Sequence, residues 1–282
     1  MKKGRKLLVL IVLLVLAAGL GIAQRTAREI PSHSTGTPNW TNDAAFQKDV
    51  FTFVRIKYSV NGTHGFGHTP DRWLIDAPDS DLNFSFRLQQ MTSLKVNPEG
   101  LFLEITDKEL FNYPFIYIVE PGRLTFTDEE VPILRKYLLN GGFLMFDDFW
   151  GQREWNGCYE EMKKVFPERE PADLAFDHPI FHCVFDLPNK PQVPGLPHVQ
   201  GREGSELTYE PVRRGDVPNS TKDPHYRALF DDKGRLMVLF CHNTDLGDGW
   251  EREGENEYYF RRFSEREAYP FGINVVFYVM TH

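Results

Sequence analysis

The chain has 282 residues and a formal net charge of −8, with 26% charged and 14% aromatic residues. The length suits one large domain preceded by a short extension. The acidic balance disfavours nucleic acid, whose phosphates are bound mainly through Lys and Arg, so we expect no nucleic-acid partner. The three cysteines, Cys158, Cys183 and Cys241, are odd in number and follow no CxxC spacing, which indicates neither a disulfide framework nor a zinc site.

Residues 1–23 are typical of an export signal. Four basic residues between Lys2 and Lys6 precede an uncharged apolar run from Leu7 to Ala23, which ends in small residues at the spacing that a signal peptidase reads. The run is near the length of about 20 residues that spans a bilayer, so a cleaved signal peptide and an uncleaved membrane anchor both fit. A core helix would show a polar face, and this run shows none. We therefore expect an exported protein that is periplasmic, secreted or held at the membrane by an N-terminal hydrophobic helix.

Residues 24–42 are polar and lack an apolar period, which predicts a flexible linker, and residues 43–282 are expected to form a single α/β domain. Residues 50–58 alternate apolar and polar side chains and predict the first strand. Residues 61–70 form a Gly-rich loop without the lysine of a phosphate-binding P-loop. Asp81 is expected to cap a helix that presents Phe84, Leu88 and Met91 on one face.

The middle of the chain predicts a βαβ unit. Residues 114–120 and 143–146 are apolar strands, and Thr127 with Glu130 forms a capping box at the start of the helix between them. Such a unit implies parallel strands and a right-handed crossover. Residues 101–105 and 235–241 predict further strands, residues 269–280 a C-terminal helix, and residues 188–224 a long insertion. The pattern indicates a three-layer, mostly parallel α/β sandwich.

Polar side chains gather directly after two of these strands. Ligands of open α/β sheets bind at the carboxyl ends of the strands, so we expect these side chains to converge there. The candidate catalytic residues are Asp147, Asp148, His242 and Asp245. The candidate ligand-binding residues are Trp73, Trp150, Asn243, Asp248 and Trp250, with Trp73 standing beside Arg72, Asp76 and Asp79 in the sequence.

Three interpretations of this group remain open. Converging carboxylates would hold a hard divalent cation such as Ca²⁺ or Mg²⁺ as a cofactor. Carboxylates beside indole rings would instead suit a carbohydrate-like small molecule. In the third interpretation the acids only cap helices and turns, and His242 donates to a carbonyl. The spacing of Asp245 and Asp248 is not that of an EF-hand, and the chain has no GxSxG nucleophile motif.

Segments spread over nearly the whole domain, with DDFWG (147–151) and HNTDLGD (242–248) the most specific, resemble the bacterial family known as domain of unknown function 4159. The resemblance implies an exported or membrane-attached protein whose fold is similar to the flavodoxin-like sandwich of class I glutamine amidotransferases and trehalose-utilisation-type proteins. Asp147 and Asp148 stand where amidotransferases carry a cysteine, so the resemblance favours the branch linked to carbohydrate metabolism over glutamine hydrolysis. The alternative hypothesis is a non-catalytic envelope protein that acts as an interaction or scaffold module.

Overall fold

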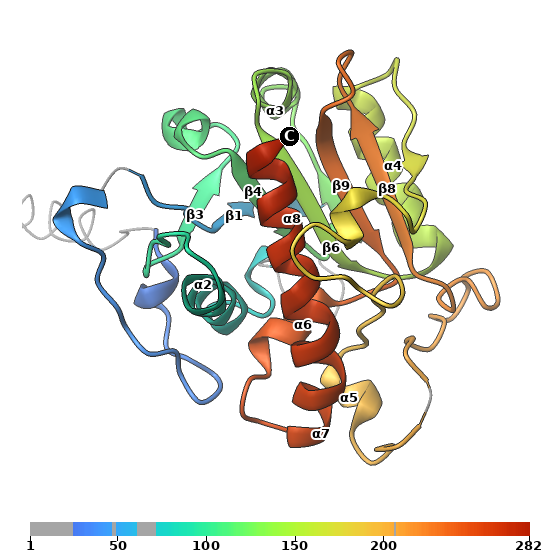
Figure 1. Ribbon diagram of the computed structural model, residues 1–282. Coiled ribbons are helices and arrows are strands. Elements are labelled where there is room, and N and C mark those ends of the chain that lie inside the picture. Colours follow the sequence, from blue (N-terminus) through green and yellow to red (C-terminus); the bar gives the residue numbers. More distant parts are fainter. Residues whose placement is uncertain (1–24, 47–48, 61–71, 206) are drawn as a thin grey trace, which may run out of the picture.

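The computed structural model describes residues 25–46, 49–60, 72–205 and 207–282 (Figure 1). The predicted signal or anchor segment and the Gly-rich loop lie outside the described residues. Among the helices that are described, none combines the length and the apolar character that a membrane crossing requires.

A seven-stranded sheet forms the centre of the domain, in the order β3-β1-β4-β6-β9-β8-β7. The strands are β1 (Val54–Lys57), β3 (Leu101–Glu104), β4 (Phe115–Val119), β6 (Phe143–Phe149), β7 (Ala172–Asp173), β8 (His225–Phe230) and β9 (Leu236–His242). The first five in the order pair in parallel, and β8 and β7 continue the sheet in antiparallel fashion. The predicted mostly parallel α/β architecture is confirmed, whereas β8 was not predicted.

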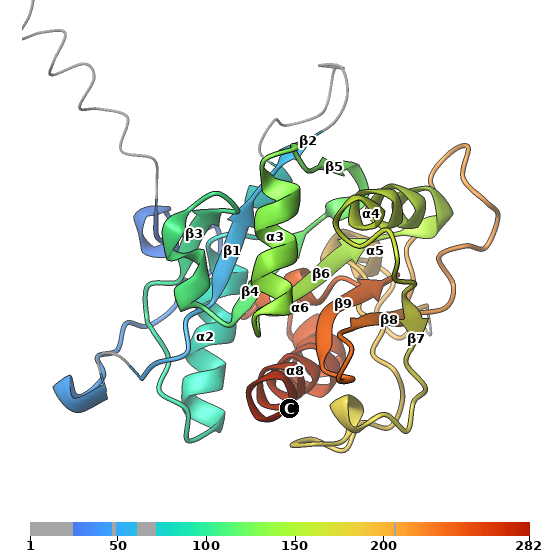
Figure 2. The ribbon, with the colours of Figure 1, turned by 90° about the horizontal axis from the view of Figure 1, so that it is seen from above.

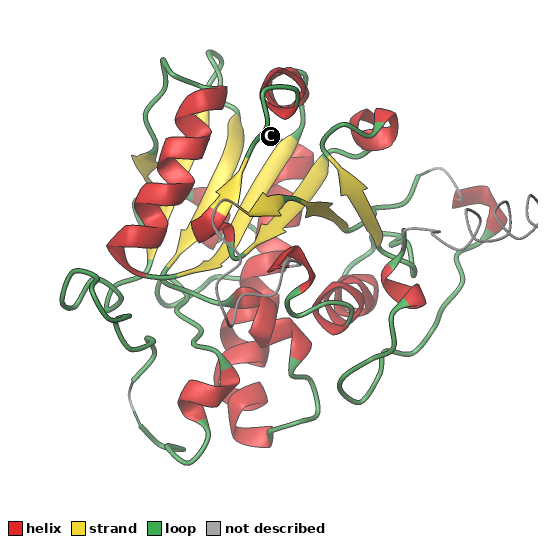
Figure 3. Ribbon diagram, turned by 180° about the vertical axis from the view of Figure 1, so that it is seen from behind, coloured by secondary structure: helices red, strands yellow, loops and turns green. Residues whose placement is uncertain are grey.

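Helices cover both faces of the sheet (Figures 2 and 3). The main helices are α2 (Asp79–Met91), α3 (Glu130–Leu139), α4 (Gly151–Val165), α5 (Leu196–Val199), α6 (Leu246–Glu251), α7 (Glu257–Tyr259) and α8 (Tyr269–Thr281), with a π-helix, η7 (Phe260–Ala268), leading into α8. The 3-10 turns are η1 (Ala27–Glu29), η2 (Ala44–Phe46), η3 (Arg72–Leu74), η4 (Lys108–Asn112), η5 (Pro121–Arg123) and η6 (Pro179–Phe181), and β2 (Ser59–Val60) pairs with β5 (Leu124–Thr125) outside the main sheet.

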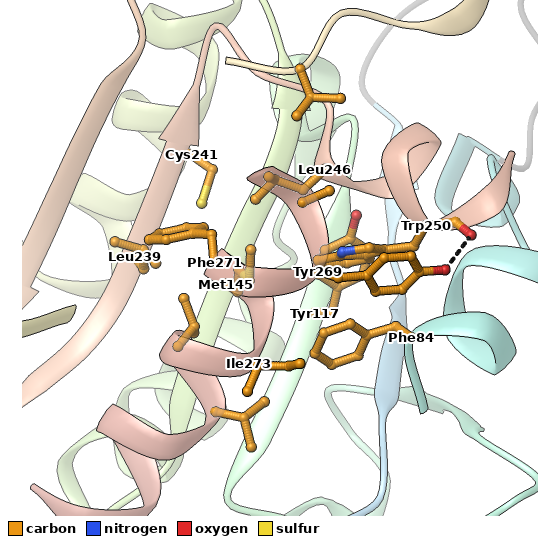
Figure 4. Packing of buried hydrophobic residues seen from close by; sticks show 14 of the residues in the cluster. Phe84, Tyr117, Met145, Leu239, Cys241, Leu246, Trp250, Tyr269, Phe271 and Ile273 are labelled. Carbon is orange, nitrogen blue, oxygen red and sulfur yellow. Dashed lines mark hydrogen bonds between the residues drawn. The ribbon is translucent and has the colours of Figure 1, made fainter. Parts of the chain in front are cut away.

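Alternation along the strands divides the apolar side chains between two cores. In β4, Tyr117 packs with α2 and α8, whereas Ile116 and Ile118 pack with α3 and α4. Side chains of a strand point alternately to opposite faces, so both faces of this strand need cover. Figure 4 shows the first core, in which Phe84 of α2 and Trp250 of α6 lie beside Tyr117.

The chain changes its direction of winding between β1 and β4. It leaves β1 for β3 through α2 on one face, and it leaves β4 for β6 through α3 on the other. The five parallel strands therefore have the order 2-1-3-4-5, in which a crevice opens at the carboxyl ends of the strands beside the reversal. In a fold of this kind, a binding site is therefore expected among the residues that follow β1, β4 and β6.

A buried ion pair attaches the segment before α2 to strand β1. Arg55 and Asp81 have fully buried side chains, and the Nε of Arg55 donates to the carboxylate of Asp81 at 3.0 Å. The same guanidinium donates to the carbonyls of Trp73 at 3.0 Å and Ile75 at 2.7 Å. Asp81 was expected to cap the helix, but α2 begins at Asp79 and the Asp81 carboxylate serves Arg55 instead. A buried guanidinium needs such a counterion, which explains the difference.

The described part of the predicted linker contacts the domain. Ala27 is completely buried, and the guanidinium of Arg28 donates to the carbonyl of Pro98 at 2.9 Å and to that of Thr37 at 2.7 Å. Ser32 donates to Asp79 at the start of α2 at 2.6 Å. Burial of Ala27 and the hydrogen bonds of Arg28 and Ser32 thus hold residues 25–38 against the surface near α2.

The Arg55–Asp81 pair yields a stability prediction. Asp81→Ala should lower the free energy of unfolding by about 3–5 kcal/mol, because it leaves a buried guanidinium without its counterion. Urea unfolding measures this loss. Asp232→Ala is the control, since the side chain of Asp232 is 89% exposed in its pair with Arg169, and it should leave the stability nearly unchanged. Equal effects of the two substitutions would contradict the importance of the buried pair.

Candidate functional site

Backbone in the left-handed region concentrates at the carboxyl edge of the sheet. Glu120 after β4 has a φ of 47°, Asp148 near the end of β6 has 53°, and Asn243 after β9 has 63°. Asp76, between η3 and α2, has a φ of 64°, so four of the five non-glycine residues described with this geometry lie here. Such backbone costs about 1–3 kcal/mol at a residue and tends to occur at functional sites.

Asp147 lies inside the sheet. It belongs to β6 and faces the same side as Met145 and Tyr117, as alternation along a strand requires. The Tyr117 hydroxyl donates to Asp147 Oδ2 at 2.9 Å, and the amide of Gly247 donates to the same oxygen at 2.8 Å. The strand was predicted over residues 143–146, so that it would end before the acids. That prediction is wrong for Asp147, which lies within β6 and is 0% exposed, because these donors replace water at one oxygen. The other oxygen, Oδ1, is buried without a hydrogen-bond partner.

Three carboxylates from separate parts of the chain meet beside Asp147. One oxygen each of Asp76, Asp148 and Asp245 lies within 4.8 Å of the others, and we call this group the three-carboxylate site. Trp150 donates its indole N–H to Asp148 at 3.0 Å, and Asp245 accepts the amide of Asp248 at 2.7 Å as the N-cap of α6. In the described ranges, no Lys, Arg or His nitrogen lies within 4.0 Å of these three carboxylates.

A neighbouring group of acids does have a counterion. Asp248 and Glu251 each place an oxygen within 4.8 Å of the other and of Asp76. However, Arg252 lies 3.0 Å from Asp248 Oδ1 and 2.9 Å from Glu251 Oε2, and the Leu196 amide donates to the second Asp248 oxygen. The charge of Asp248 and Glu251 is therefore partly compensated from within the protein.

Burial and mutual repulsion shift the ionisation of these acids. Burial first, and then the charges of Glu120 and Glu210, raise the pKa of Asp148 well above its ordinary value. Burial followed by Asp148 and Asp248 does the same to the pKa of Asp245. The pKa of Asp76 is also raised well above its ordinary value, mainly by burial and then by Asp248. The charged state of the three-carboxylate site is thus unfavourable unless a cation is present.

The predicted insertion, residues 188–224, closes one side of the group. A Cβ atom built on Gly195 would lie 3.1 Å from Glu210 Oε1 and 3.4 Å from the Oδ2 atoms of Asp245 and Asp248. These carboxylates therefore surround the Gly195 Cα, where a side chain would crowd them. Glu210 and Glu251 were not predicted from the sequence, and Asp76 was predicted only as a neighbour of Trp73. The insertion has no regular spacing that would have revealed Glu210.

His242 does not join the acids. Its Nε2 atom donates to the carbonyl of Gly151 at 2.9 Å, and its Nδ1 atom lies 3.1 Å from the guanidinium of Arg227. The ring stacks on Phe149 at a centroid distance of 5.0 Å, in the core opposite Asp147. Burial lowers the pKa of His242 to about 3, so the imidazole is neutral. His242 follows Cys241, which faces the Asp147 side, and alternation turns the next side chain away.

The remaining candidate residues have mainly structural contacts. The amide of Asn243 accepts from the Gly151 N–H at 2.9 Å and donates to the carbonyls of Ser220 and Asp223, each at 2.8 Å. Trp250 is 1% exposed and packs on Phe84, as Figure 4 shows.

Neither of the other two candidate tryptophans, Trp73 and Trp150, forms a stacking wall at the acids. Trp150 is 2% exposed, so only its N–H reaches the site, through Asp148. Trp73 lines a separate hollow of about 430 Å³ with Lys57 and Thr127.

The raised pKa values predict a dependence of stability on pH in protein freed of divalent cations. A carboxyl whose pKa is raised by folding binds more protons in the folded state. Stability therefore falls as the pH rises from the pKa of the unfolded state to that of the folded state. Burial raises the pKa of Asp147 to about 7 and that of Glu251 to about 10. His242, whose pKa is lowered, changes stability only below about pH 6.5. We therefore expect stability to fall between about pH 6.5 and 8.

Urea unfolding in the presence of a chelator measures this slope. Asp148→Asn removes one of the acids with a raised pKa and should make the slope shallower, and Asp232→Asn is the matched exposed control. An unchanged slope in the Asp148→Asn variant would contradict the repulsion within the site.

Comparison with known proteins agrees with the resemblance noted in the sequence. A search of curated proteins gives no match. Residues 52–280 match the model of a protein family described as domain of unknown function DUF4159, and this range includes every acid of the site. The match covers well over half of the chain, so the chain belongs to the DUF4159 family.

Proposed function

We propose that the domain binds one divalent cation, Ca²⁺ or Mg²⁺, through Asp76, Asp148 and Asp245. The observation behind this proposal is that these carboxylates lie within 4.8 Å of one another and have no counterion among the described residues. Both cations prefer oxygen ligands, and carboxylates are their usual protein ligands. The three left-handed or capping positions hold the oxygens in place before any ion arrives, which limits the cost of ordering them.

Asp147 and Arg252 support the choice of this position. The unpartnered Oδ1 of Asp147 belongs to a side chain that is 0% exposed, and the charge of Asp147 contributes to the raised pKa values of Asp76, Asp148 and Asp245. It therefore adds negative potential behind the site. The second group of acids already has Arg252, so a cation gains less there.

The ligand of the loaded site, in this proposal, is a carbohydrate-like polyhydroxylated molecule. Asp76 and Asp148 are partly exposed, and a cation held by three carboxylates keeps coordination positions for other oxygens. Recognition would run through hydroxyl oxygens on the cation and on the carboxylates, because the indole rings of Trp150 and Trp250 are buried. The strand order 2-1-3-4-5 supports the flavodoxin-like and amidotransferase-like fold that the resemblance implies, and the basic and apolar residues 1–23 support export or membrane attachment.

Titration of the protein with CaCl₂ and MgCl₂ after chelation tests the cation site. A cation at 100 times its dissociation constant should add about 2.7 kcal/mol to the free energy of unfolding. Asp76→Asn, Asp148→Asn and Asp245→Asn should each abolish most of this gain. Asn tolerates left-handed backbone and is a good N-cap, so these changes remove charge with little strain. Asp148→Asn should also stabilise the cation-free protein, because it removes a repelled charge.

Asp232→Asn is the control and should keep the full response to the cation. Absence of any stabilisation of the unmodified protein by either cation would contradict the proposal, and it would favour the interpretation of the domain as a non-catalytic interaction module. Unfolding of the Asp148→Asn variant would show instead that Asp148 is a structural residue.

A further inference from the structure

The hollow that Trp73 lines lies where the chain reverses its direction of winding, and we call it the Trp73 hollow. Lys57 at the end of β1 and Trp73 of η3 belong to the connection that leads to α2. Thr127 and Glu129 belong to the connection that leads to α3 on the opposite face. Open α/β sheets bind their ligands in the crevice at such a reversal. The volume of about 430 Å³ is within the range of about 300–1,000 Å³ that is typical of ligand sites.

The indole ring of Trp73 is fixed before any ligand arrives. The carbonyl of Trp73 accepts a hydrogen bond from the guanidinium of Arg55 at 3.0 Å, so the buried pair of Arg55 and Asp81 holds η3 on β1. The ring itself packs on the edge or face of the buried Phe102 ring, with 5.4 Å between the centroids. Trp73 nevertheless stays half-buried and lines the hollow. A ring held in this way loses little freedom when a ligand packs against it.

Charges of both signs stand beside this ring. The ammonium of Lys57 lies over the Trp73 ring, 5.4 Å from its centroid. Glu104, which pairs in register with Lys57 at the end of β3, and Glu129 before α3 are exposed and also line the hollow. The hollow therefore combines a hydrogen-bond donor and acceptors with an aromatic surface.

This combination disfavours a charged ligand. An anion would lie beside the carboxylates of Glu104 and Glu129, and a cation would lie beside the ammonium of Lys57, which already interacts with the ring. A hydroxyl group both donates and accepts, so it suits an ammonium and a carboxylate together. A sugar ring carries several hydroxyls and also C–H groups, which pack well on an indole ring.

We propose that the Trp73 hollow binds one neutral sugar ring, with C–H groups against Trp73 and hydroxyls at Lys57 and Glu129. This inference rests on the proposed function for the class of ligand, but it requires no cation. Trp73 and Asp76 belong to the same segment before α2, so the hollow and the three-carboxylate site lie at the same edge of the sheet. The hollow thus provides a second contact region for the carbohydrate-like molecule.

The experiment is a calorimetric titration of the whole protein, freed of divalent cations, with glucose, galactose, N-acetylglucosamine and maltose. We expect saturable binding of at least one of these sugars at one site per chain. Trp73→Ala and Glu129→Gln should each weaken it by about tenfold or more, the effect of losing an aromatic contact or a charge-assisted hydrogen bond. Trp73→Phe should have a smaller effect. Glu129 is exposed, so the Glu129→Gln variant should fold even if Trp73→Ala disturbs the packing on Phe102.

Two matched controls should bind the sugar as the unmodified protein does. Asp128→Asn removes an exposed charge next to Glu129 from a residue that does not line the hollow. Trp40→Phe changes a half-buried indole elsewhere, which packs on Phe86 and donates to the carbonyl of Val96 at 2.9 Å.

Three results would each overturn the proposal: failure of all four sugars to bind, unchanged binding by the Glu129→Gln or Trp73→Ala variant, or tighter binding of choline than of any sugar. The cation site is tested separately. A protein that is stabilised by Ca²⁺ or Mg²⁺ but binds no sugar would refute the Trp73 hollow alone. Sugar binding that depends on Trp73 in a protein without any response to either cation would refute the cation site alone.

Discussion

The carboxyl edge of this sheet depends on a backbone constraint shared by three neighbouring strands. β4 and β9 lead directly into residues with left-handed geometry, Glu120 and Asn243, and in β6 the penultimate residue, Asp148, has the same geometry. A left-handed residue turns the chain sharply, so the side chains near the ends of these strands gather over the edge. At Asp148 this turn also shifts the register between β6 and β9. Asp and Asn accept such geometry more readily than most residues, which suits a strained edge built from polar side chains.

Buried acids in this domain are neutralised in different ways. Asp81 has the guanidinium of Arg55, Asp248 has Arg252, and Asp147 has neutral donors on one oxygen only. Within the described part of the chain, the carboxylates of the three-carboxylate site have no arginine counterion, and their hydrogen-bond donors do not replace one. A buried charge without a partner costs several kcal/mol, so a protein retains such a group only where protons or a ligand can compensate for it. The contrast between these acids therefore distinguishes those that stabilise the fold from those available for binding.

The sequence predicted the parts of the structure that depend on local pattern. The unit from β4 to β6 follows from two apolar runs and a capping box, and the Thr127 and Glu130 contacts are present. Alternation along β6 also explains why Asp147 faces away from Phe146. His242 was misplaced because proximity in sequence to Asp245 was taken as proximity in space, although alternation after Cys241 directs it to the other core. The approach of Asp76 to α6 depends on contact between distant segments, including the absence of a side chain at Gly247, where a Cβ would lie 2.4 Å from Asp76 Oδ2.

The anchoring of the insertion bears on how this family diversifies. Its beginning is held beside β9, where Val193 accepts the amide of Asp245 at 2.7 Å, and its end is held by Asn243, which donates to Ser220 at 2.8 Å. Both ends of residues 194–219 are therefore fixed at the same place, next to the acids. Closing a longer loop between fixed ends costs only about 0.6 kcal/mol for each doubling of its length. Leu196 and Val199 pack into the core at the start of this loop, so relatives can lengthen or shorten it at little expense only after Val199, and differences in what they bind should be found first in that part.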